Sequence, residues 1–165
     1  MGKPLSPPHS PVQQVDAAVA LTSLPAVPGV YALRLVLQNP CQVALGRRSI
    51  ALPAGCYLYV GSARGPGGLR ARLGRHLSGA GRPHWHIDAL RGRAQVVGAY
   101  YCAASVPLEC RWAHALLALP GVTAPAPGFG ASDCRAGCPA HLLLCHALAD
   151  DIRLTLEAAA LSGGA

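Results

Sequence analysis

The pattern of apolar and polar residues predicts a set of short strands in the first two thirds of the chain. Residues 30–37 are almost all apolar, which is typical of a central strand covered on both faces. Residues 56–60 form an aromatic, β-prone run that stops at Gly61, and they predict a second strand. Residues 94–102 predict a third. Two further short runs flank Gly46-Arg47-Arg48 and predict a hairpin over residues 42–52.

Helical spacing replaces this strand pattern after the glycine-rich loop 61–68. Leu69, Leu73 and Leu77 make one apolar stripe and predict a helix over residues 68–77. Pro107 stands where first-turn prolines stand, before a helix that ends at Pro120-Gly121. We also expect a terminal helix over residues 150–161. Residues 84–90 favour a short helix, although their alternation also suits a strand.

Together these elements predict an α+β fold. We expect a small, mainly antiparallel sheet, with three central strands plus an extra hairpin, flanked by helices. Residues 1–24 contain four prolines and predict a mobile tail. The domain itself is expected to cover residues 25–148, followed by a C-terminal helix and tail over residues 149–165.

Composition narrows the class of protein. Apolar residues make up 52% of the chain and charged residues 13%, but no apolar run reaches the ~18 residues of a membrane span. The N-terminus lacks the continuous apolar segment of a secretory signal. Seven cysteines are an odd number without a regular framework, which favours reduced thiols. We therefore expect a cytoplasmic protein without a membrane partner.

The charge of the chain is unevenly distributed. The net charge is +7, and seven arginines but a single acid, Asp88, lie between residues 64 and 93. Such a cluster is expected of a surface that binds a polyanion, although a solvated, arginine-rich surface is the alternative. The residues that we expect to contact nucleic acid are Arg64, Arg70, Arg75, Arg82 and His84.

Several side chains have the chemistry of a phosphodiester site. Arg72 and His76 are one helical turn apart, so they lie side by side along the leucine stripe. An arginine grips phosphate oxygens bidentately, and a nearby histidine can assist proton transfer. Glu109 stands in the first turn of a helix, where it either complements the helix dipole or holds Mg²⁺. Each residue also has a purely structural interpretation.

Two histidine and cysteine clusters could hold a metal ion. His84, His86 and Asp88 would share a face on a strand, but we expect a hydrogen-bonded cluster there. Cysteine and histidine recur again near the C-terminus, at residues Cys134, Cys138, His141 and Cys145. That spacing is not a standard zinc knuckle, and buried free cysteines are common. The sequence therefore predicts no structural Zn²⁺ site.

The combination of motifs resembles a known superfamily. Gly29-Val30-Tyr31 followed by Tyr59-Val60-Gly61 is similar to the paired motif of the GIY-YIG nucleases. Arg72 and His76 fall in the following helix, where that family keeps its arginine and often a histidine, and Glu109 matches its metal-binding glutamate. The runs at residues 61–63, 84–88 and 129–134 are similar to one small branch. That branch has long been carried as a domain of unknown function and is sometimes fused to an endonuclease III-like glycosylase.

The resemblance covers residues 28–145 and implies a metal-dependent endonuclease that hydrolyses phosphodiester bonds in DNA, with structured or damaged DNA as candidate substrates. It implies Mg²⁺ or Mn²⁺ on Glu109, with Tyr31 activating the nucleophile and Tyr59 orienting it. It also implies that Arg72 and His76 are catalytic, and that DNA repair supplies the partners.

Two departures from the family pattern keep an alternative open. The interval from Tyr31 to Tyr59 is long because the extra hairpin fills it, and Asn39, the only asparagine, cannot supply the late asparagine of the family. Ser132 or Asp133 could take its place. The alternative function is a nucleic-acid-binding module that keeps the fold without cleavage. A zinc hydrolase built on the histidines and aspartate of residues 84–88 ranks below both.

Overall fold

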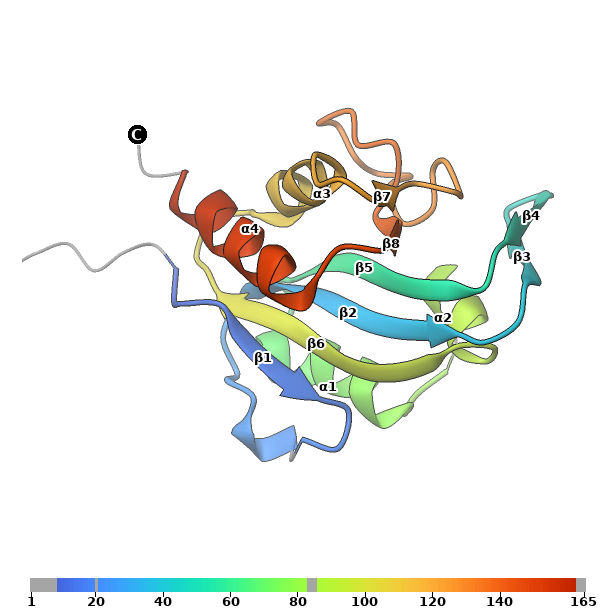
Figure 1. Cartoon of the computed structure of the whole chain (residues 1–165). Coiled ribbons are helices and arrows are strands. Elements are labelled where there is room, and N and C mark those ends of the chain that lie inside the picture. Colours follow the sequence, from blue (N-terminus) through green and yellow to red (C-terminus); the bar gives the residue numbers. More distant parts are fainter. Residues whose placement is uncertain (1–8, 20, 83–85, 163–165) are drawn as a thin grey trace, which may run out of the picture.

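The structure, a computed structural model, describes residues 9–19, 21–82 and 86–162. Within these residues, one sheet of six antiparallel strands runs through the centre of the molecule, in the order β1-β6-β2-β5-β8-β7 (Figure 1). A separate two-stranded hairpin projects from one end of the sheet. Helices cover both faces. The predicted α+β class with a mainly antiparallel sheet is confirmed.

The three predicted central strands form the middle of the sheet. Strand β2 (Gly29–Leu37) pairs along its length with β5 (Gly55–Ala63) on one side and with β6 (Gln95–Ala103) on the other. Seven of its nine side chains are buried. The nearly continuous apolar run of residues 30–37 is explained by this position, because helices cover both faces of β2.

Three further strands of the sheet, among them both edge strands, were not expected from the pattern, since each is short. β7 (Val122–Thr123) and β8 (Leu142–Cys145) extend the sheet beyond β5. β1 (Gln13–Asp16) pairs with β6 and lies in the segment that we expected to be a mobile tail. Residues 9–19 and 21–24 are instead docked on the domain. Pro11, the one proline in these described residues, precedes β1 and leaves its hydrogen-bonding edge intact.

The first part of the chain is held by an arginine as well as by β1. A short 3₁₀ helix, η1 (Leu21–Ser23), leads to Leu24, which is fully buried. Arg70 donates to the carbonyl oxygens of Leu24, at 2.8 Å, and of Thr22, at 3.3 Å. A residue expected to contact phosphate therefore fixes the segment that precedes β2.

The extra hairpin consists of β3 (Cys41–Leu45) and β4 (Arg48–Leu52), joined by a turn in which Gly46 has a φ of 60°. Its apolar side chains, among them Val43 and Leu52, join the core beside α2. The remaining backbone of the hairpin stands clear of the sheet (Figure 1).

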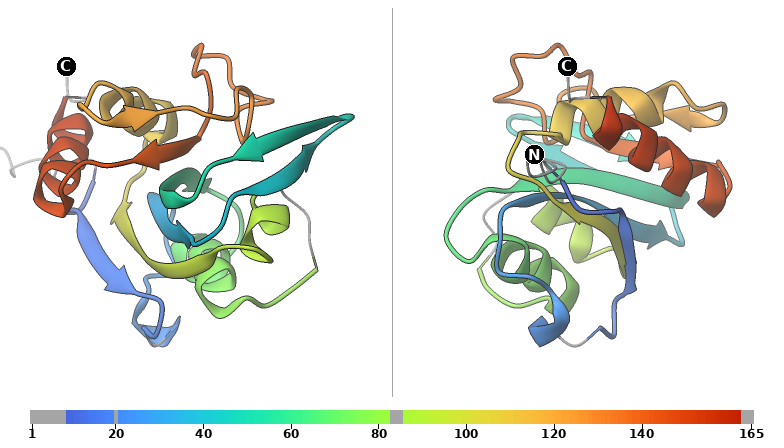
Figure 2. Two further views of the ribbon diagram at one scale, coloured as in Figure 1. Left: turned by 45° about the vertical axis from the view of Figure 1, so that its right-hand side comes forward. Right: turned by 90° about the vertical axis from the view of Figure 1, so that its left-hand side faces the viewer.

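The sheet separates two apolar clusters. Helices α1 (Gly68–Ser78) and α2 (His86–Arg91) cover one face, and α3 (Glu109–Leu117) and α4 (Ala149–Leu161) cover the other (Figure 2). The segment with ambiguous alternation is thus helical from residue 86. None of the helices in the described part of the chain has the length and apolarity needed to cross a membrane.

Candidate functional site

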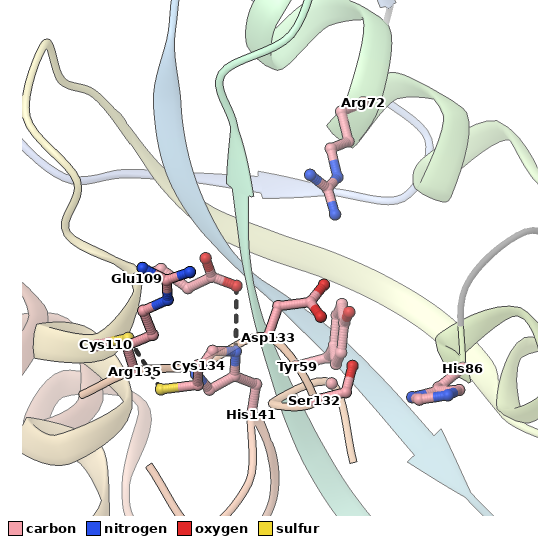
Figure 3. Close-up of a pocket in the computed structure, with 11 residues that line it drawn as sticks. Tyr59, Arg72, His86, Glu109, Cys110, Ser132, Asp133, Cys134, Arg135 and His141 are labelled. Carbon is pink, nitrogen blue, oxygen red and sulfur yellow. Dashed lines mark hydrogen bonds and ion pairs between the residues drawn. The ribbon is translucent and has the colours of Figure 1, made fainter. Parts of the chain in front are cut away.

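A pocket of about 700 Å³ opens at the end of β5 (Figure 3). Strand β8 pairs with β5 only over residues 57–59. In the described structure the last part of β5, residues 61–63, has β2 on one side and no strand on the other. The pocket is lined by Tyr59, Arg72, His86, Glu109, Cys110, Gly130, Ser132, Asp133, Cys134, Arg135 and His141.

Three of the five predicted catalytic residues meet in this pocket. Tyr59 comes from β5, Arg72 from α1 and Glu109 from the first turn of α3. The two helices lie on opposite faces of the sheet, so their side chains can meet only at its edge. Arg72 reaches that edge directly, since its Nη1 donates to the carbonyl oxygen of Ser62 in β5.

The other two predicted catalytic residues, Tyr31 and His76, are buried beside the pocket and do not line it. The hydroxyl of Tyr31 lies 3.0 Å from Nε2 of His76. Burial raises the pKa of Tyr31 well above its usual value, although the Arg72 guanidinium opposes the shift. Burial, and then the Arg91 charge, lower the pKa of His76 to about 4. Both side chains are therefore neutral at pH 7.

Tyr59 is the tyrosine that faces the pocket. Burial raises its pKa to about 12, and the nearby Arg72 charge offsets this only in part. Its ring packs edge-on against Phe129, with ring centroids 6.4 Å apart. Gly130 follows with a φ of 71°, and a Cβ there would lie 2.8 Å from the Tyr59 ring. The loop therefore needs glycine at this position in order to pass so close to the tyrosine.

The same loop adds polar side chains to the pocket that the sequence analysis named only as substitutes for the family asparagine or did not name. Ser132 and Asp133, the candidate substitutes for the family asparagine, both line the pocket and are exposed. Arg135 and His86 also line it; His86 was considered only as part of the His84, His86 and Asp88 cluster, and Arg135 was not predicted at all. The only feature of the sequence that could have indicated Arg135 is its position two residues after Asp133.

The predicted nucleic-acid contacts are distributed differently. Arg64 donates to the carbonyl oxygen of Ser105 at 3.1 Å, and Arg70 holds the segment before β2. Arg75 bonds the carbonyl oxygen of Arg82, which is exposed. His84 lies outside the described residues. Several arginines of this basic run therefore have partners within the chain.

Asp88 joins two of these arginines. Its carboxylate oxygens lie 3.1 Å from Nη2 of Arg75 and 3.1 Å from Nη1 of Arg91, and its side chain is 4% exposed. Both oxygens thus take part in ion pairs; the pair with Arg75 joins α1 to α2, and the pair with Arg91 lies within α2. The cluster that we expected of His84, His86 and Asp88 stays a prediction, because His84 lies outside the described residues. The two arginines leave the aspartate poorly placed as a metal ligand.

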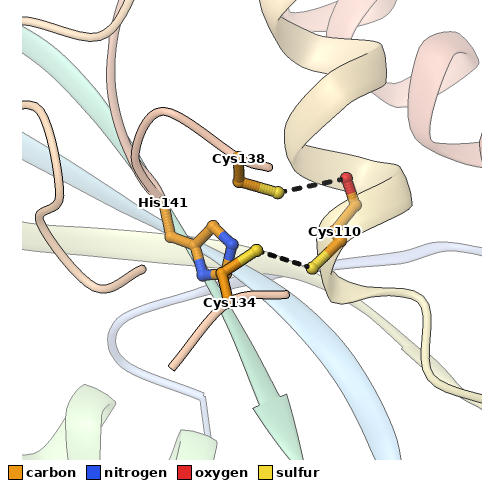
Figure 4. Close-up of side chains that lie close together, drawn as sticks. All are labelled: Cys110, Cys134, Cys138 and His141. Carbon is orange, nitrogen blue, oxygen red and sulfur yellow. Dashed lines mark hydrogen bonds between the residues drawn. The ribbon is translucent and has the colours of Figure 1, made fainter. Parts of the chain in front are cut away.

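The prediction of no structural zinc is wrong. One ligand atom from each of Cys110, Cys134, Cys138 and His141 lies within 4.8 Å of all the others (Figure 4). Ligand atoms around a tetrahedral zinc ion lie about 3.8 Å apart, and three cysteines with one histidine are a common structural set. The four residues are all half-buried or buried. They form a donor set suited to a structural Zn²⁺ ion.

The fourth member of the cluster is Cys110 rather than Cys145. Cys110 stands in the first turn of α3, and its sulfur lies 3.4 Å from that of Cys134, a residue 24 positions away in the chain. Cys145 is at the end of β8 and is buried in the apolar cluster beneath α3 and α4. Sequence spacing missed the set because tertiary packing supplies the first ligand.

The donor atoms themselves fit a zinc ion. Both ring nitrogens of His141 are buried, and neither makes a hydrogen bond in the described structure. Burial opposes ionisation of Cys134, but the backbone N–H groups of Cys138 and Ala136 favour its thiolate and lower its pKa to about 6. A buried imidazole nitrogen without a partner and a readily ionised thiol are the groups that zinc requires.

The zinc cluster and the pocket share a boundary. Nδ1 of His141 lies 3.1 Å from Oε1 of Glu109, and this contact is drawn as a dashed line in Figure 3. Cys110, Cys134 and His141 line the pocket as well as belonging to the cluster. The metal centre is therefore part of the pocket wall.

Comparison with known proteins places the chain in a family. The family model described as "Domain of unknown function DUF123" matches residues 30–161. Neither a curated protein nor a solved structure matches the sequence significantly. The match covers every element from β2 to α4 and includes the pocket and the cluster.

Proposed function

The chain belongs to the DUF123 family, and from this premise we propose that it is a divalent-metal-dependent endonuclease that hydrolyses phosphodiester bonds in DNA. One observation carries the proposal. Tyr59, Arg72 and Glu109 come from three separate elements and line one pocket. A phenol, a guanidinium and a carboxylate are the groups that such a hydrolysis uses. The finer assignment to the GIY-YIG superfamily, with structured or damaged DNA as substrate, is part of the same proposal.

Arg72 would bind the scissile phosphate. Its hydrogen bond to the Ser62 carbonyl fixes the guanidinium at the edge of β5. A fixed guanidinium stabilises the charge that builds on phosphorus without reorganising during the reaction. Arg135, which lines the same pocket, adds a second positive charge that can bind the DNA phosphate backbone.

Glu109 would hold the divalent cation. Its side chain is 29% exposed and lines the pocket, and Asp133 and Ser132 offer further oxygen atoms nearby. Carboxylate and hydroxyl oxygens are the ligands that Mg²⁺ and Mn²⁺ prefer. When bound, such a cation neutralises phosphate charge. Asp133 or Ser132 then takes the role of the family asparagine.

The two tyrosines would act at different depths. Tyr59 faces the pocket and can orient the attacking water through its hydroxyl. Tyr31 is fully buried, and its hydroxyl meets His76. As a neutral phenol Tyr31 is no base, and the low pKa of His76, about 4, makes its imidazole a weak one. Tyr31 would accept the water's proton only as a phenolate, which the positive charge of a bound cation would favour.

A second candidate function is DNA binding without cleavage. Burial raises the pKa of both Tyr31 and Tyr59, which disfavours a phenolate base. The family asparagine is also absent. These two observations favour a binding module and make the cleavage assay decisive. A zinc hydrolase on residues 84–88 has less support, because Asp88 is held by two arginines.

The test is incubation of zinc-loaded protein with nicked, branched and plain duplex DNA, with and without Mg²⁺ or Mn²⁺. We expect products only with added cation. Glu109→Gln should slow cleavage at least about 100-fold, because it removes the cation's charged ligand. DNA binding without added cation should be unchanged. Glu157→Gln is the matched control, since that carboxylate pairs with Arg153 on α4.

Three results would contradict the proposal: the first removes the nuclease activity, and the other two remove Glu109 as the specific ligand of its cation. The first is the absence of product from every DNA at any cation concentration, together with tight binding, which selects the binding module. The second is equal cleavage by wild type and Glu109→Gln. The third is a loss of cleavage in Glu157→Gln as large as that in Glu109→Gln. Zinc content is measured in each variant, so that a lost structural metal is not mistaken for a lost catalytic one.

A further inference from the structure

We propose that His141 is a positioning residue that couples the zinc centre to the catalytic pocket. In this arrangement the imidazole binds zinc through Nε2 and holds the Glu109 carboxylate through Nδ1, so that zinc sets the orientation of Glu109. The zinc half of this proposal depends only on the cluster. The half that concerns the catalytic cation rests on the proposed function.

The two nitrogens of His141 face different partners. Nδ1 lies 3.1 Å from Oε1 of Glu109. Both nitrogens are buried and neither makes a hydrogen bond among the described residues, so the contact with Glu109 is what sets Nδ1 apart; the residue belongs to the cluster of four ligands. With Nδ1 turned to the carboxylate, Nε2 is the nitrogen left for a metal ion. One ring therefore bridges the cluster and the pocket.

The backbone holds the His141 ring in a fixed place. The His141 N–H donates to the carbonyl oxygen of Phe129 at 2.8 Å, and its carbonyl oxygen accepts from the N–H of Val60 at 2.9 Å. The second bond continues the ladder between β8 and β5. His141 is thus attached to the strand that carries Tyr59, at the level of the pocket.

Glu109 is constrained from two directions. It precedes the ligand Cys110 in the chain, so a zinc ion would fix the start of α3 as well as the ring of His141. One carboxylate oxygen contacts His141, which leaves Oε2 as the oxygen available to the pocket (Figure 3). Without zinc, both the helix start and the histidine lose this restraint.

The physical basis is the behaviour of zinc-bound histidines. Such a ring donates its second N–H to a carboxylate or carbonyl group, which fixes its tautomer and strengthens the metal bond. Coupling between two sites is reciprocal, so a carboxylate that strengthens zinc binding is itself held by the zinc. Loss of a partner of this kind costs about 10–100-fold in metal affinity.

The first experiment exchanges the bridging ligand. His141→Cys leaves four thiolates for zinc and removes the nitrogen that contacts Glu109. We expect one zinc per chain, as in the wild type, but Mn²⁺ binding at least about 10-fold weaker by electron paramagnetic resonance titration. Cleavage should need correspondingly more Mg²⁺. The control is His146→Cys, the same substitution at an exposed histidine, which should bind Mn²⁺ as the wild type does.

The second experiment measures the coupling in the opposite direction, as the effect of the Glu109 carboxylate on zinc affinity. It does not depend on whether His141→Cys folds. Glu109→Gln should bind zinc about 10–100-fold more weakly than wild type in competition with a chromophoric chelator. Glu157→Gln should retain wild-type zinc affinity. Both measurements use the full chain and need no DNA.

The outcomes separate this proposal from the proposed function. Weakened zinc binding in Glu109→Gln, in a protein that binds Mn²⁺ but never cleaves DNA, supports the coupling and removes the nuclease. Wild-type zinc affinity in Glu109→Gln overturns the coupling, even if the protein is an active nuclease. Wild-type Mn²⁺ affinity in zinc-loaded His141→Cys, or no Mn²⁺ binding by wild type with or without DNA, overturns it as well.

Discussion

The pair formed by Tyr31 and His76 shows how burial changes the chemistry of two familiar side chains. Both were predicted to act directly on the substrate, yet both are almost fully buried and bond one another at 3.0 Å. Their polar atoms lie next to Arg72, which does line the pocket. The pair therefore lies behind the pocket wall, while Tyr59 and Arg72 line the pocket.

The buried histidine predicts a dependence of stability on pH. Burial lowers the pKa of His76 to about 4, whereas a histidine in the unfolded chain has a pKa near 6.5. Between these values the unfolded chain binds a proton that the folded chain does not. The free energy of unfolding should therefore fall as the pH falls, by about 2 kcal/mol between pH 7 and pH 5 from this residue.

Urea unfolding of wild type and His76→Gln at both pH values measures this contribution. The amide of glutamine keeps a partner for the Tyr31 hydroxyl but does not titrate in this range. The loss of stability between pH 7 and pH 5 should be smaller in the variant by about 2 kcal/mol. Equal losses in the two proteins would show that His76 is not held neutral by the fold.

At the scale of elements, β5 illustrates how one strand positions both tyrosines. Tyr59 is opposite Leu33, and Gly61 is opposite Tyr31 on β2. A Cβ at Gly61 would lie 2.4 Å from the hydroxyl oxygen of Tyr31. Gly61 therefore has no side chain because the Tyr31 phenol occupies that space. The strand does not end at this glycine but continues to Ala63.

This close approach predicts a large effect of one methyl group. Gly61→Ala should lower the free energy of unfolding by about 1–3 kcal/mol, because the Tyr31 ring must shift or the strands must part. Gly65→Ala is the control, since a Cβ there has no atom within 4 Å. Thermal and urea unfolding of both variants measure the difference. A Gly61→Ala protein as stable as wild type would rule out this packing role.

At the scale of the molecule, two layers on opposite faces of the sheet meet at one edge. The first layer contributes Arg72, and the second contributes Glu109 and Cys110. The loop that carries Cys134 and Cys138 contains no helix or strand, so few backbone hydrogen bonds restrain it. A zinc ion on the four ligands would fasten this loop to α3 and close one side of the pocket.

The ligand set predicts which cysteine variants lose zinc. Cys138→Ser should reduce the zinc content well below one per chain and lower the melting temperature, because it removes a ligand of the set. Cys145→Ser replaces a free thiol that lies in the apolar cluster, outside the ligand set, and should retain one zinc. Metal analysis of both proteins is the measurement. Loss of zinc from Cys145→Ser with retention in Cys138→Ser would contradict the assignment.

The main elements could be predicted because burial imposes a period on the sequence. Strand β2 is covered on both faces and reads as an apolar run, and the leucine stripe of α1 repeats at helical spacing. The resemblance to the GIY-YIG motif implied one site for five residues, and three of them, Tyr59, Arg72 and Glu109, line the same pocket. Short strands such as β1 and β7 carry too few residues to establish a period, so they were missed.

Packing between distant segments accounts for what the pattern did not contain. Nothing in the spacing of Cys134, Cys138 and His141 indicates Cys110, because that ligand arrives with α3. The burial of Tyr31 and the docking of Leu24 likewise depend on neighbours far along the chain. The period of apolar residues indicates which side chains of a segment are buried and which are exposed to solvent. It does not report which segments meet each other, and the environment of each titratable group follows from those contacts.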